Sequence, residues 1–383
     1  MANNNLNLGI DASNIRSGGG VTHLVEILRA AKPSNYGISR VIIWGGSKTL
    51  EALKDRPWLQ KIKSPDLDKS LLKRIFWQRF QFTNAAQAYD CDLLFVPGGL
   101  FTGSFRPYVS MFQNMQIFET SELNREGLSL EWFRLRLLQR SQLRTFIGSS
   151  GLICLSEYSL KYIMEYYPKI NDLNVRNIAH GINEIPQNQY QAEIDDSSKV
   201  LRILYVSTVK KYKHQWNLID AVGILRKEGY NLFLELIGSG DSKALRKMHQ
   251  AIDRNKIYGD YVNYHGELNH KATLNFYNKV DIFVFPSSCE TFGISLLEAM
   301  NSGLPIACSD RGPMSEILKD SGRYFNPLSV KSITNCLRYL IDRPELRKKL
   351  GVKSRKYANH YSWEKCAAET FSFIQKSYKK YIS

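Results

Sequence analysis

Short apolar runs alternate with longer amphipathic stretches in both halves of this sequence. The apolar runs are bounded by turn residues and occupy 6–11, 41–44, 92–96, 108–112 and 152–155 in the first half, then 203–206, 232–237, 281–285 and 304–308 in the second. Runs of strand length that alternate with stretches of helical length predict parallel strands, because the connecting helices then cover both faces of the sheet. We therefore expect an α/β fold with two parallel sheets.

The chain has 383 residues, more than one ordinary domain, which favours two domains. The segment 186–199 is polar and interrupts the alternation, so we place a linker there. The first domain then spans 1–185 and the second spans 200–360. We expect the segment 361–383, which Ser362 can cap, to form a last helix that packs back on the first domain.

The composition is typical of a globular protein in a reducing compartment. Hydrophobic residues make up 43% of the chain and charged residues 23%, which excludes disordered and collagen-like proteins. The six cysteines form no CxxC pair, which argues against structural zinc and against a disulfide framework. No run approaches the roughly 18 apolar residues of a membrane-spanning helix, and no signal-peptide pattern is found. We expect a cytoplasmic protein.

The net charge of +16 favours an anionic partner such as a nucleotide, a lipid head group or a nucleic acid. A basic nucleic-acid-binding protein is one reading, but the sequence has no helix-turn-helix, zinc-finger or RNP-like signature. In the stretch 132–144, apolar residues and Arg136, Arg140 and Arg144 recur at helical spacing. Such a helix could lie on an anionic membrane, or it could pack on the core with a basic outer face.

A glycine-rich turn, Gly18-Gly19-Gly20, separates the first apolar run from a helical pattern. Such a turn lets a ligand approach the backbone at a helix N-terminus, which makes Gly19 and Gly20 candidates for a cleft. The turn lacks the GxGxxG spacing of a dinucleotide site. A flexible turn without a ligand is the alternative.

The segment 281–303 is the most informative about chemistry. Pro286 should end a buried strand, and a helix should begin near Gly293. Glu290 then lies in the loop, and Glu298 lies about one turn inside the helix with its side chain tilted back toward the loop. Both carboxylates should therefore face one cleft.

Between these carboxylates the helix N-terminus provides an anion site. The first-turn amides around Gly293, Ile294 and Ser295 lack intrahelical acceptors, and the helix dipole adds to their attraction for an anion. One carboxylate can accept hydrogen bonds from the two hydroxyls of a ribose, and the other can bind a sugar beyond the phosphates. A nucleotide-sugar presents its groups in that order.

The two glutamates belong to a longer string that resembles the signature of the retaining glycosyltransferases of family 4. The string reads Pro286-Ser-Ser-x-Glu290-x-Phe-Gly-x-x-x-x-Glu298-Ala-Met-x-x-Gly-x-Pro. The resemblance continues at Gly238-Ser-Gly240, Tyr264-His-Gly-Glu-Leu268 and Ser362-Trp-Glu364, and in outline at Gly18–Gly20, Pro97-Gly-Gly99 and Ser156-Glu157. It implies the GT-B fold, in which two Rossmann-like domains with parallel sheets face a central cleft.

The resemblance also implies roles for particular residues. Lys213 and Glu290 are the catalytic candidates, Lys213 at the diphosphate and Glu290 at the donor hexose, while Glu298 binds the ribose. An ammonium beside two phosphates offsets the charge that grows on the leaving group, which lowers the barrier to bond cleavage. The other donor-binding candidates are Phe292, Gly293, Ile294, Ser295, Ser207, Thr208, Lys210 and Leu268.

Two positions depart from the family's pattern. Many relatives carry an arginine where this chain has Thr208, so Lys210 or Lys211 would have to supply that charge. A histidine is common where this chain has Gln113 and Asn114, whose amides can hydrogen-bond a sugar but cannot act as a base. The acceptor-side or cleft candidates are Gly19, Gly20, Gln113 and Asn114.

The reaction implied by the resemblance is retaining transfer of a hexose from a nucleoside-diphosphate sugar to a glycan or polyprenyl-linked saccharide. The setting implied is bacterial surface-polysaccharide synthesis, of O-antigen or capsule, by a cytoplasmic enzyme at the cytosolic face of the inner membrane. In front-face attack the departing phosphate takes the acceptor's proton, whereas the competing glycosidase mechanism uses two carboxylates.

Two further expectations complete this reading. Asp90-Cys-Asp92 has the DxD spacing of some metal sites, but two carboxylates directly before a buried strand are more typical of the strand's solvated start. We therefore expect no metal or other cofactor. A sugar-nucleotide epimerase or a phosphorylase of the same architecture remains the alternative. The sequence leaves open the base, the hexose, the acceptor and the linkage.

Overall fold

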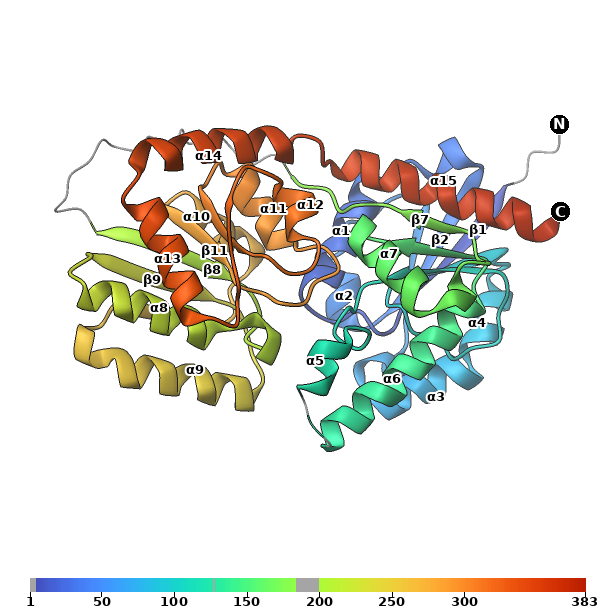
Figure 1. Ribbon diagram of the computed structural model, residues 1–383. Coiled ribbons are helices and arrows are strands. Elements are labelled where there is room, and N and C mark those ends of the chain that lie inside the picture. Colours follow the sequence, from blue (N-terminus) through green and yellow to red (C-terminus); the bar gives the residue numbers. More distant parts are fainter. Residues whose placement is uncertain (1–4, 126, 128, 184–199) are drawn as a thin grey trace. The chain divides into compact units, whose positions relative to one another are not determined.

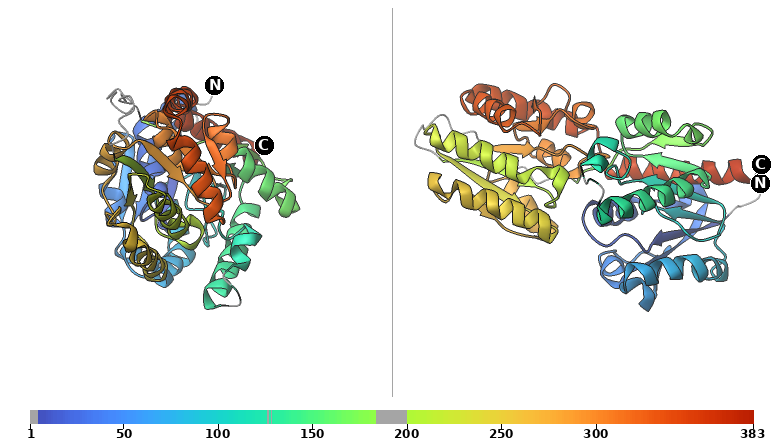
Figure 2. Two further views of the ribbon diagram at one scale, coloured as in Figure 1. Left: turned by 60° about the vertical axis from the view of Figure 1, so that its left-hand side comes forward. Right: turned by 60° about the horizontal axis from the view of Figure 1, so that its bottom comes forward.

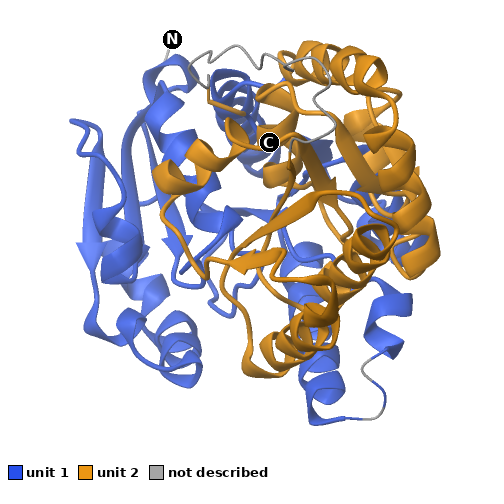
Figure 3. Ribbon diagram, turned by 90° about the vertical axis from the view of Figure 1, so that its left-hand side faces the viewer, with its two compact units in different colours: residues 1–181, 361–383 blue, residues 182–360 orange. Residues whose placement is uncertain are grey.

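The computed structural model describes residues 5–125, 127, 129–183 and 200–383, so the expected linker at 186–199 lies outside the described residues. The chain divides into two compact units (Figure 3). Unit 1 comprises residues 1–181 and 361–383, and unit 2 comprises residues 182–360. Each unit contains one sheet whose strands pair in parallel, which confirms the predicted α/β class with two parallel sheets.

Unit 1 is built on a seven-stranded sheet in the order β3-β2-β1-β4-β5-β6-β7 (Figure 1). Its strands are β1 (Leu6–Ala12), β2 (Ile38–Gly45), β3 (Leu59–Lys63), β4 (Leu93–Val96), β5 (Tyr108–Phe112), β6 (Gly151–Cys154) and β7 (Val175–Asn177). Its helices are α1 (Gly19–Ala30), α2 (Ser47–Glu51), α3 (Leu71–Phe80), α4 (Phe82–Ala88), α5 (Thr120–Asn124), α6 (Leu130–Ile147), α7 (Glu157–Tyr166) and α15 (Trp363–Ile382). Helices α1 and α15 pack together on one face of the sheet, while α3, α4 and α6 cover the other (Figures 1 and 2).

Unit 2 is built on a six-stranded sheet in the order β10-β9-β8-β11-β12-β13. Its strands are β8 (Leu201–Val206), β9 (Leu232–Ile237), β10 (Val262–Tyr264), β11 (Ile282–Phe285), β12 (Ile306–Ser309) and β13 (Arg323–Phe325). Its helices are α8 (Gln215–Lys227), α9 (Ser242–Asn255), α10 (His270–Tyr277), α11 (Ile294–Asn301), α12 (Met314–Leu318), α13 (Val330–Ile341) and α14 (Pro344–Ala358). Helices α8 and α9 pack together on one face of this sheet, and α10, α11 and α14 lie on the other (Figures 1 and 2).

The central strands are buried along their whole length, as expected of a sheet covered on both faces. All residues of β4, β6, β11 and β12 are buried. Such strands need apolar side chains on both faces, which is why they occur as continuous apolar runs in the sequence.

The strand order reverses once in each sheet, and this reversal determines where a ligand can bind. In unit 2 the chain runs outward from β8 to β10 and then returns to place β11 on the other side of β8. The loops that leave the carboxyl ends of β8 and β11 lead to helices on opposite faces of the sheet, and in sheets of this order a crevice lies outside the ends of two such strands. In open α/β sheets, ligands bind at this switch point.

The last helix, α15, belongs to unit 1 although it follows unit 2 in the sequence. Ser362 caps it, since its hydroxyl oxygen accepts a hydrogen bond from the Lys365 amide at 3.1 Å. Trp363 and Ile374 are buried, and the helix contacts α1, β5 and β6. Among the described residues, no helix combines the length and the apolar character that crossing a bilayer requires.

Candidate functional site in unit 2

The candidate site lies at the switch point of unit 2, where the loops after β8 and β11 meet. Several hydrogen bonds join these two loops. The Ser288 amide donates to the Tyr212 carbonyl oxygen at 2.9 Å. The Ser288 hydroxyl and His214 Nε2 lie 2.9 Å apart. The two loops therefore form one connected rim above the ends of β8 and β11.

Lys213 and Glu290, one from each loop, form an ion pair in this rim. Lys213 Nζ binds Glu290 Oε1, and both side chains are largely shielded from water. The ammonium also lies 5.2 Å from the centre of the Tyr212 ring and 5.7 Å from that of Phe285. Because the pair is partly buried, water and salt screen the attraction between its two charges only weakly.

A residue of strand β8 fixes the backbone position of Lys213. Tyr205, a buried residue of β8, donates its hydroxyl to the Lys213 carbonyl oxygen at 3.0 Å. Burial raises the pKa of Tyr205 well above its usual range, and the nearby charge of Glu290 raises it further. Tyr205 therefore stays protonated and acts as a donor that fixes the lysine's position.

The Lys213 loop also packs against the glycine turn after β9. The Val209 amide donates to the Ser239 carbonyl oxygen at 2.7 Å. A Cβ at Gly238 would lie 2.1 Å from the Ser207 carbonyl oxygen, so only glycine permits this close approach. Gln215 donates a hydrogen bond through Nε2 to the Thr208 carbonyl oxygen at 3.1 Å. Ser207 and Thr208 are thus placed at the crevice by backbone contacts.

Helix α11 begins at the switch point, directly after the loop that follows β11. Gly293 precedes it with a φ of 115°, a conformation that glycine adopts without strain, and it has no side chain that could cap the helix. The Leu297 amide is bonded to the Gly293 carbonyl oxygen at 3.2 Å, whereas the amides of Ile294 and Ser295 precede the first intrahelical bond. The helix begins where the sequence predicted it.

Glu298 lies on the first turns of α11 and is held by two partners on α10. His270 Nε2 lies 2.8 Å from Glu298 Oε1, and the Tyr277 hydroxyl donates to Oε2 at 2.8 Å. Burial raises the pKa of Tyr277 well above its usual range, and the Glu298 carboxylate raises it further. Glu298 is itself buried, so the two donors fix the direction of its carboxylate.

The sequence analysis missed His270 and Tyr277. They lie 28 and 21 residues before Glu298, and no motif links them to it. Leu268 lies just before α10 and is partly exposed, and the Gly266 carbonyl beside it accepts the Gly238 amide at 2.7 Å. The loop around Leu268 thus adjoins the glycine turn of the crevice. Lys210 is exposed and directly precedes the short 3-10 helix Lys211–Lys213.

The acceptor-side candidates lie in unit 1. Gly20 is in the first turn of α1, and a Cβ there would lie 3.2 Å from Gln113 Oε1, so the start of α1 and the end of β5 adjoin. Gly19 begins α1, and Gln113 and Asn114 follow β5 and are partly exposed. These four residues share the carboxyl edge of the unit 1 sheet.

Asp90 and Asp92 lie at the opposite edge of the same sheet. Asp92 Oδ2 accepts a hydrogen bond from the Asn7 amide at 2.7 Å, so this carboxylate binds the backbone at the start of β1. Among the residues that the structure describes, no three or more His, Cys, Asp or Glu side chains are grouped so that they could hold a metal ion.

Comparison with known proteins identifies the family of this switch-point site. The family "Glycosyl transferases group 1" matches residues 186–357, which include the Lys213 loop, Glu290 and α11. Residues 186–357 belong to this family, and the chain is a glycosyltransferase. The resemblance to family 4 is thereby confirmed.

Individual relatives of this glycosyltransferase are distant. The O-antigen chain mannosyltransferase B of Escherichia coli is 23% identical over 277 residues, which cover 69% of each chain. An uncharacterized glycosyltransferase of Haemophilus influenzae is 24% identical over 368 residues, covering 94% of this chain and 98% of the relative. The sucrose-phosphate synthase structure from Thermosynechococcus elongatus superposes with a TM-score of 0.76 over 98% of this chain and 99% of that one, at 16% identity. The predicted GT-B fold is confirmed by this match.

Proposed function

We propose that this glycosyltransferase moves a hexose from a nucleoside-diphosphate sugar to a glycan or polyprenyl-linked saccharide with retention of configuration. The arrangement around α11 supports this proposal most directly. A cation at Lys213, amide donors at the start of α11 and a fixed carboxylate at Glu298 follow one another at the switch point. This series is complementary to a diphosphate with hydroxyl-bearing groups on either side.

The donor would bind with its diphosphate at the N-terminus of α11. The amides of Ile294 and Ser295 donate to phosphate oxygens, and the Lys213 ammonium neutralises part of their charge. Glu298, with its carboxylate held by His270 and Tyr277, accepts hydrogen bonds from the ribose hydroxyls. Glu290 binds hydroxyls of the hexose. Phe292, Ser207, Thr208, Lys210 and Leu268 border the same donor.

In the transfer step, the bond between the anomeric carbon and the diphosphate oxygen breaks. The acceptor's hydroxyl oxygen bonds to the anomeric carbon from the same face, and the departing phosphate oxygen takes the hydroxyl proton. Negative charge grows on the diphosphate, so Lys213 and the α11 amides bind the transition state more tightly than the ground state. The step as written requires neither a protein base nor a metal ion.

The acceptor would bind to unit 1, where Gly19, Gly20, Gln113 and Asn114 share one sheet edge. The similarity to an O-antigen chain mannosyltransferase supports a glycan or lipid-linked saccharide of bacterial surface-polysaccharide synthesis as the acceptor. Such an acceptor would place the enzyme at the cytosolic face of the inner membrane. Peripheral contact with anionic lipid through α6 fits that location.

Thermal-shift measurements with UDP, GDP and ADP sugars test the donor site. We expect one class of nucleotide-sugar to raise the melting temperature, because a ligand that binds only the folded state stabilises it. Glu298→Gln should weaken this shift, whereas Glu345→Gln, an exposed change on α14, should leave it unchanged. Equal shifts for the parent and Glu298→Gln would contradict the assignment of the ribose site.

Transfer assays with the identified donor test the reaction. Glu290→Ala should lower turnover by more than it lowers the melting temperature. Parent-like transfer rates in both glutamate variants would show that the site is misassigned. Consumption of the nucleotide-sugar without any acceptor would instead indicate an epimerase.

A further inference from the structure

His214 links the two loops that carry Lys213 and Glu290. Strands β8 and β11 are neighbours in the unit 2 sheet, so the loops that follow them leave neighbouring positions on one sheet edge (Figure 1). His214 lies in the first loop, between the 3-10 helix Lys211–Lys213 and α8. Its ring reaches the second loop, where Nε2 lies 2.9 Å from the hydroxyl oxygen of Ser288. This contact therefore joins a residue next to Lys213 to one that nearly adjoins Glu290.

The hydrogen bonds around Ser288 determine which atom of this contact is the donor. The Ser288 hydroxyl donates to the Tyr212 carbonyl oxygen at 3.2 Å, and a hydroxyl has only one proton to donate. His214 Nε2 must then carry a proton and donate to the Ser288 hydroxyl oxygen. The Ser288 amide also donates to the Tyr212 carbonyl oxygen, at 2.9 Å. We call this chain of bonds, from His214 through Ser288 to Tyr212, the His214 bridge.

The backbone of His214 does not itself require a histidine. Its φ of 53° and ψ of 33° lie in the left-handed region, where glycine has no steric cost and other residues are uncommon. This conformation turns the chain into α8, since the His214 carbonyl oxygen accepts the amides of Asn217 at 3.0 Å and Leu218 at 3.3 Å. Glycine would make the same turn and the same backbone bonds. What histidine adds at this position is the imidazole donor.

Packing fixes the direction of this imidazole. His214 is 1% exposed, and its ring lies 6.2 Å from that of Trp216 with an angle of 72° between the two planes. Trp216 is buried as well, and the Lys247 ammonium lies 4.0 Å from the centre of its ring. A donor whose rotamer is held by packing positions its acceptor more exactly than a mobile surface side chain does.

The His214 bridge differs from the ion pair that spans the same two loops. In the structure, Lys213 Nζ binds Glu290 Oε1. In the proposed donor complex the ammonium faces the diphosphate and the carboxylate faces the hexose, so this ion pair no longer holds the loops together. The bridge uses neither the ammonium nor the carboxylate, and it therefore persists when the donor is bound.

We propose that His214 is a positioning residue for the transfer step and holds the Lys213 loop against the Glu290 loop while the donor is bound. Lys213 must stay at the diphosphate and Glu290 at the hexose as charge grows on the leaving group. A misplacement of about 1 Å in such a site costs up to about 10²-fold in rate. This inference rests on the proposed function, which places Lys213 and Glu290 at the donor, and His214 acts through Ser288 and Tyr212.

Two substitutions of His214 separate the N–H donor from the volume of the ring. The assay uses the UDP, GDP or ADP sugar that raises the melting temperature of the parent. His214→Phe keeps an aromatic ring without the donor, so kcat should fall about 10- to 10²-fold. The donor KM should stay within about threefold, because the α11 amides that bind the diphosphate lie outside the bridge.

His214→Gln is the rescue variant. Its amide nitrogen can donate at nearly the distance of Nε2 from the backbone, so kcat should return to within about threefold of the parent. If His214 served packing alone, His214→Gln would lose at least as much activity as His214→Phe, because it lacks the ring. That order of the two variants, or a parent-like kcat in His214→Phe, overturns the proposal.

A double-mutant cycle with Ser288→Ala tests the bond itself. Ser288→Ala alone should lower kcat to the same extent as His214→Phe. The double variant should lose no more than either single variant, because both substitutions break the same bridge. Losses that multiply in the double variant would show that the two residues act independently. In histidine-labelled protein without substrate, the NMR signal of the His214 Nε2 proton should exchange slowly with water and lose this protection in Ser288→Ala.

Asp90 provides a matched control for the backbone conformation. It has a φ of 51°, it is exposed, and it belongs to unit 1. Glycine relaxes the backbone at either position, so His214→Gly removes the imidazole without a backbone cost. We expect kcat to fall in His214→Gly as it does in His214→Phe, and to stay at the parent value in Asp90→Gly. A parent-like kcat in His214→Gly would show that only the turn is needed.

Lys213→Met, assayed with the same donor, distinguishes failure of this inference from failure of the proposed function. A low kcat in Lys213→Met with a parent-like kcat in His214→Phe overturns the bridge and leaves the proposed function in place. Parent-like values in both variants overturn both. If the enzyme consumes its nucleotide-sugar without an acceptor, the proposed transfer fails alone, and a slower consumption in His214→Phe still supports the bridge.

Discussion

Lys213 is the residue on which the proposed transfer step depends most directly. Lys213→Met keeps most of the length of the side chain but removes the charge, so kcat should fall about 10²- to 10³-fold at saturating donor. The loss follows from the missing counter-charge on the departing diphosphate. Lys227→Met, an exposed change at the end of α8, is the matched control and should retain full activity. A kcat within a factor of about two of the parent would remove Lys213 from the mechanism.

Tyr277 is expected to act through Glu298 and not by touching the donor. Tyr277→Phe removes the hydroxyl that bonds Glu298 Oε2 at 2.8 Å and leaves the ring in the core. The donor KM should rise about tenfold with kcat nearly unchanged, since a hydrogen bond to a charged group is lost. Tyr381→Phe, at an exposed position of α15, should change neither constant. A fall in kcat at constant KM would contradict a positioning role.

The sequence predicts site residues only where they are close to one another along the chain. Glu290 and Glu298 are close in sequence, so a strand end and a helix start suffice to direct them to one junction. His270 and Tyr277 approach Glu298 only because α10 and α11 pack together, and that packing depends on tertiary structure. No periodic pattern in the sequence predicts that α10 packs against α11.

At the scale of elements, α11 depends on the backbone conformation of Gly293. Gly293→Ala places a side chain at a φ of 115° and a Cβ 3.4 Å from the Phe285 ring, which should cost about 1–3 kcal/mol of unfolding free energy. Because the first-turn amides would shift, donor affinity should fall as well. Gly229→Ala is the matched control, with a φ of 98° and no heavy atom within 4 Å of the added Cβ. Calorimetry should show weaker donor binding for Gly293→Ala alone; equal donor affinity in the two variants would exclude the α11 amides from the site.

The strands that the sequence analysis missed lie at or near sheet edges. β10 and β13 have three residues each, and β3 has a half-exposed pattern throughout. An edge strand is covered on fewer sides, so it does not need the continuous apolar run that revealed the central strands. The central strands were predictable because burial on both faces constrains every residue.

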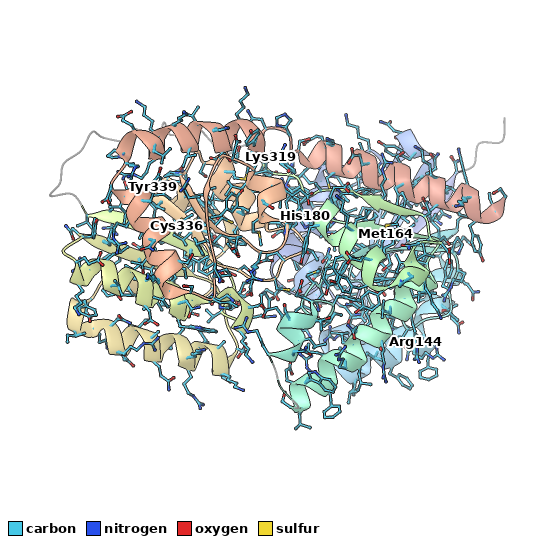
Figure 4. All side chains as sticks on the ribbon, viewed as in Figure 1. Arg144, Met164, His180, Lys319, Cys336 and Tyr339 are labelled. Carbon is cyan, nitrogen blue, oxygen red and sulfur yellow. The ribbon has the colours of Figure 1, made fainter. Side chains whose placement is uncertain are left out.

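At the scale of the whole molecule, unit 1 is assembled from two separated chain segments that meet at a buried histidine pair. His23 of α1 and His180 approach each other with their Nδ1 atoms 2.9 Å apart, and the Trp363 ring of α15 lies 5.7 Å from that of His23 (His180 is labelled in Figure 4). In this pair one Nδ1 donates and the other accepts, so protonation of the acceptor places two N–H groups opposite each other. The pair is therefore compatible with the fold only when uncharged.

Stability of unit 1 should consequently fall in mild acid. Burial lowers the pKa of His23 from 6.5 to about 4, and burial together with the charge of His23 lowers the pKa of His180. Between pH 6.5 and about pH 4 the unfolded chain binds more protons than the folded chain. The stabilisation from the uncharged pair is therefore complete above pH 6.5 and is lost as the pH falls toward about 4. For His23 alone it amounts to about 3 kcal/mol. Melting temperatures between pH 7.5 and 4.5 should fall less steeply for His23→Gln than for the parent, and His360→Gln, an exposed control, should match the parent. Identical slopes for His23→Gln and the parent would show that the buried pair does not set the acid sensitivity.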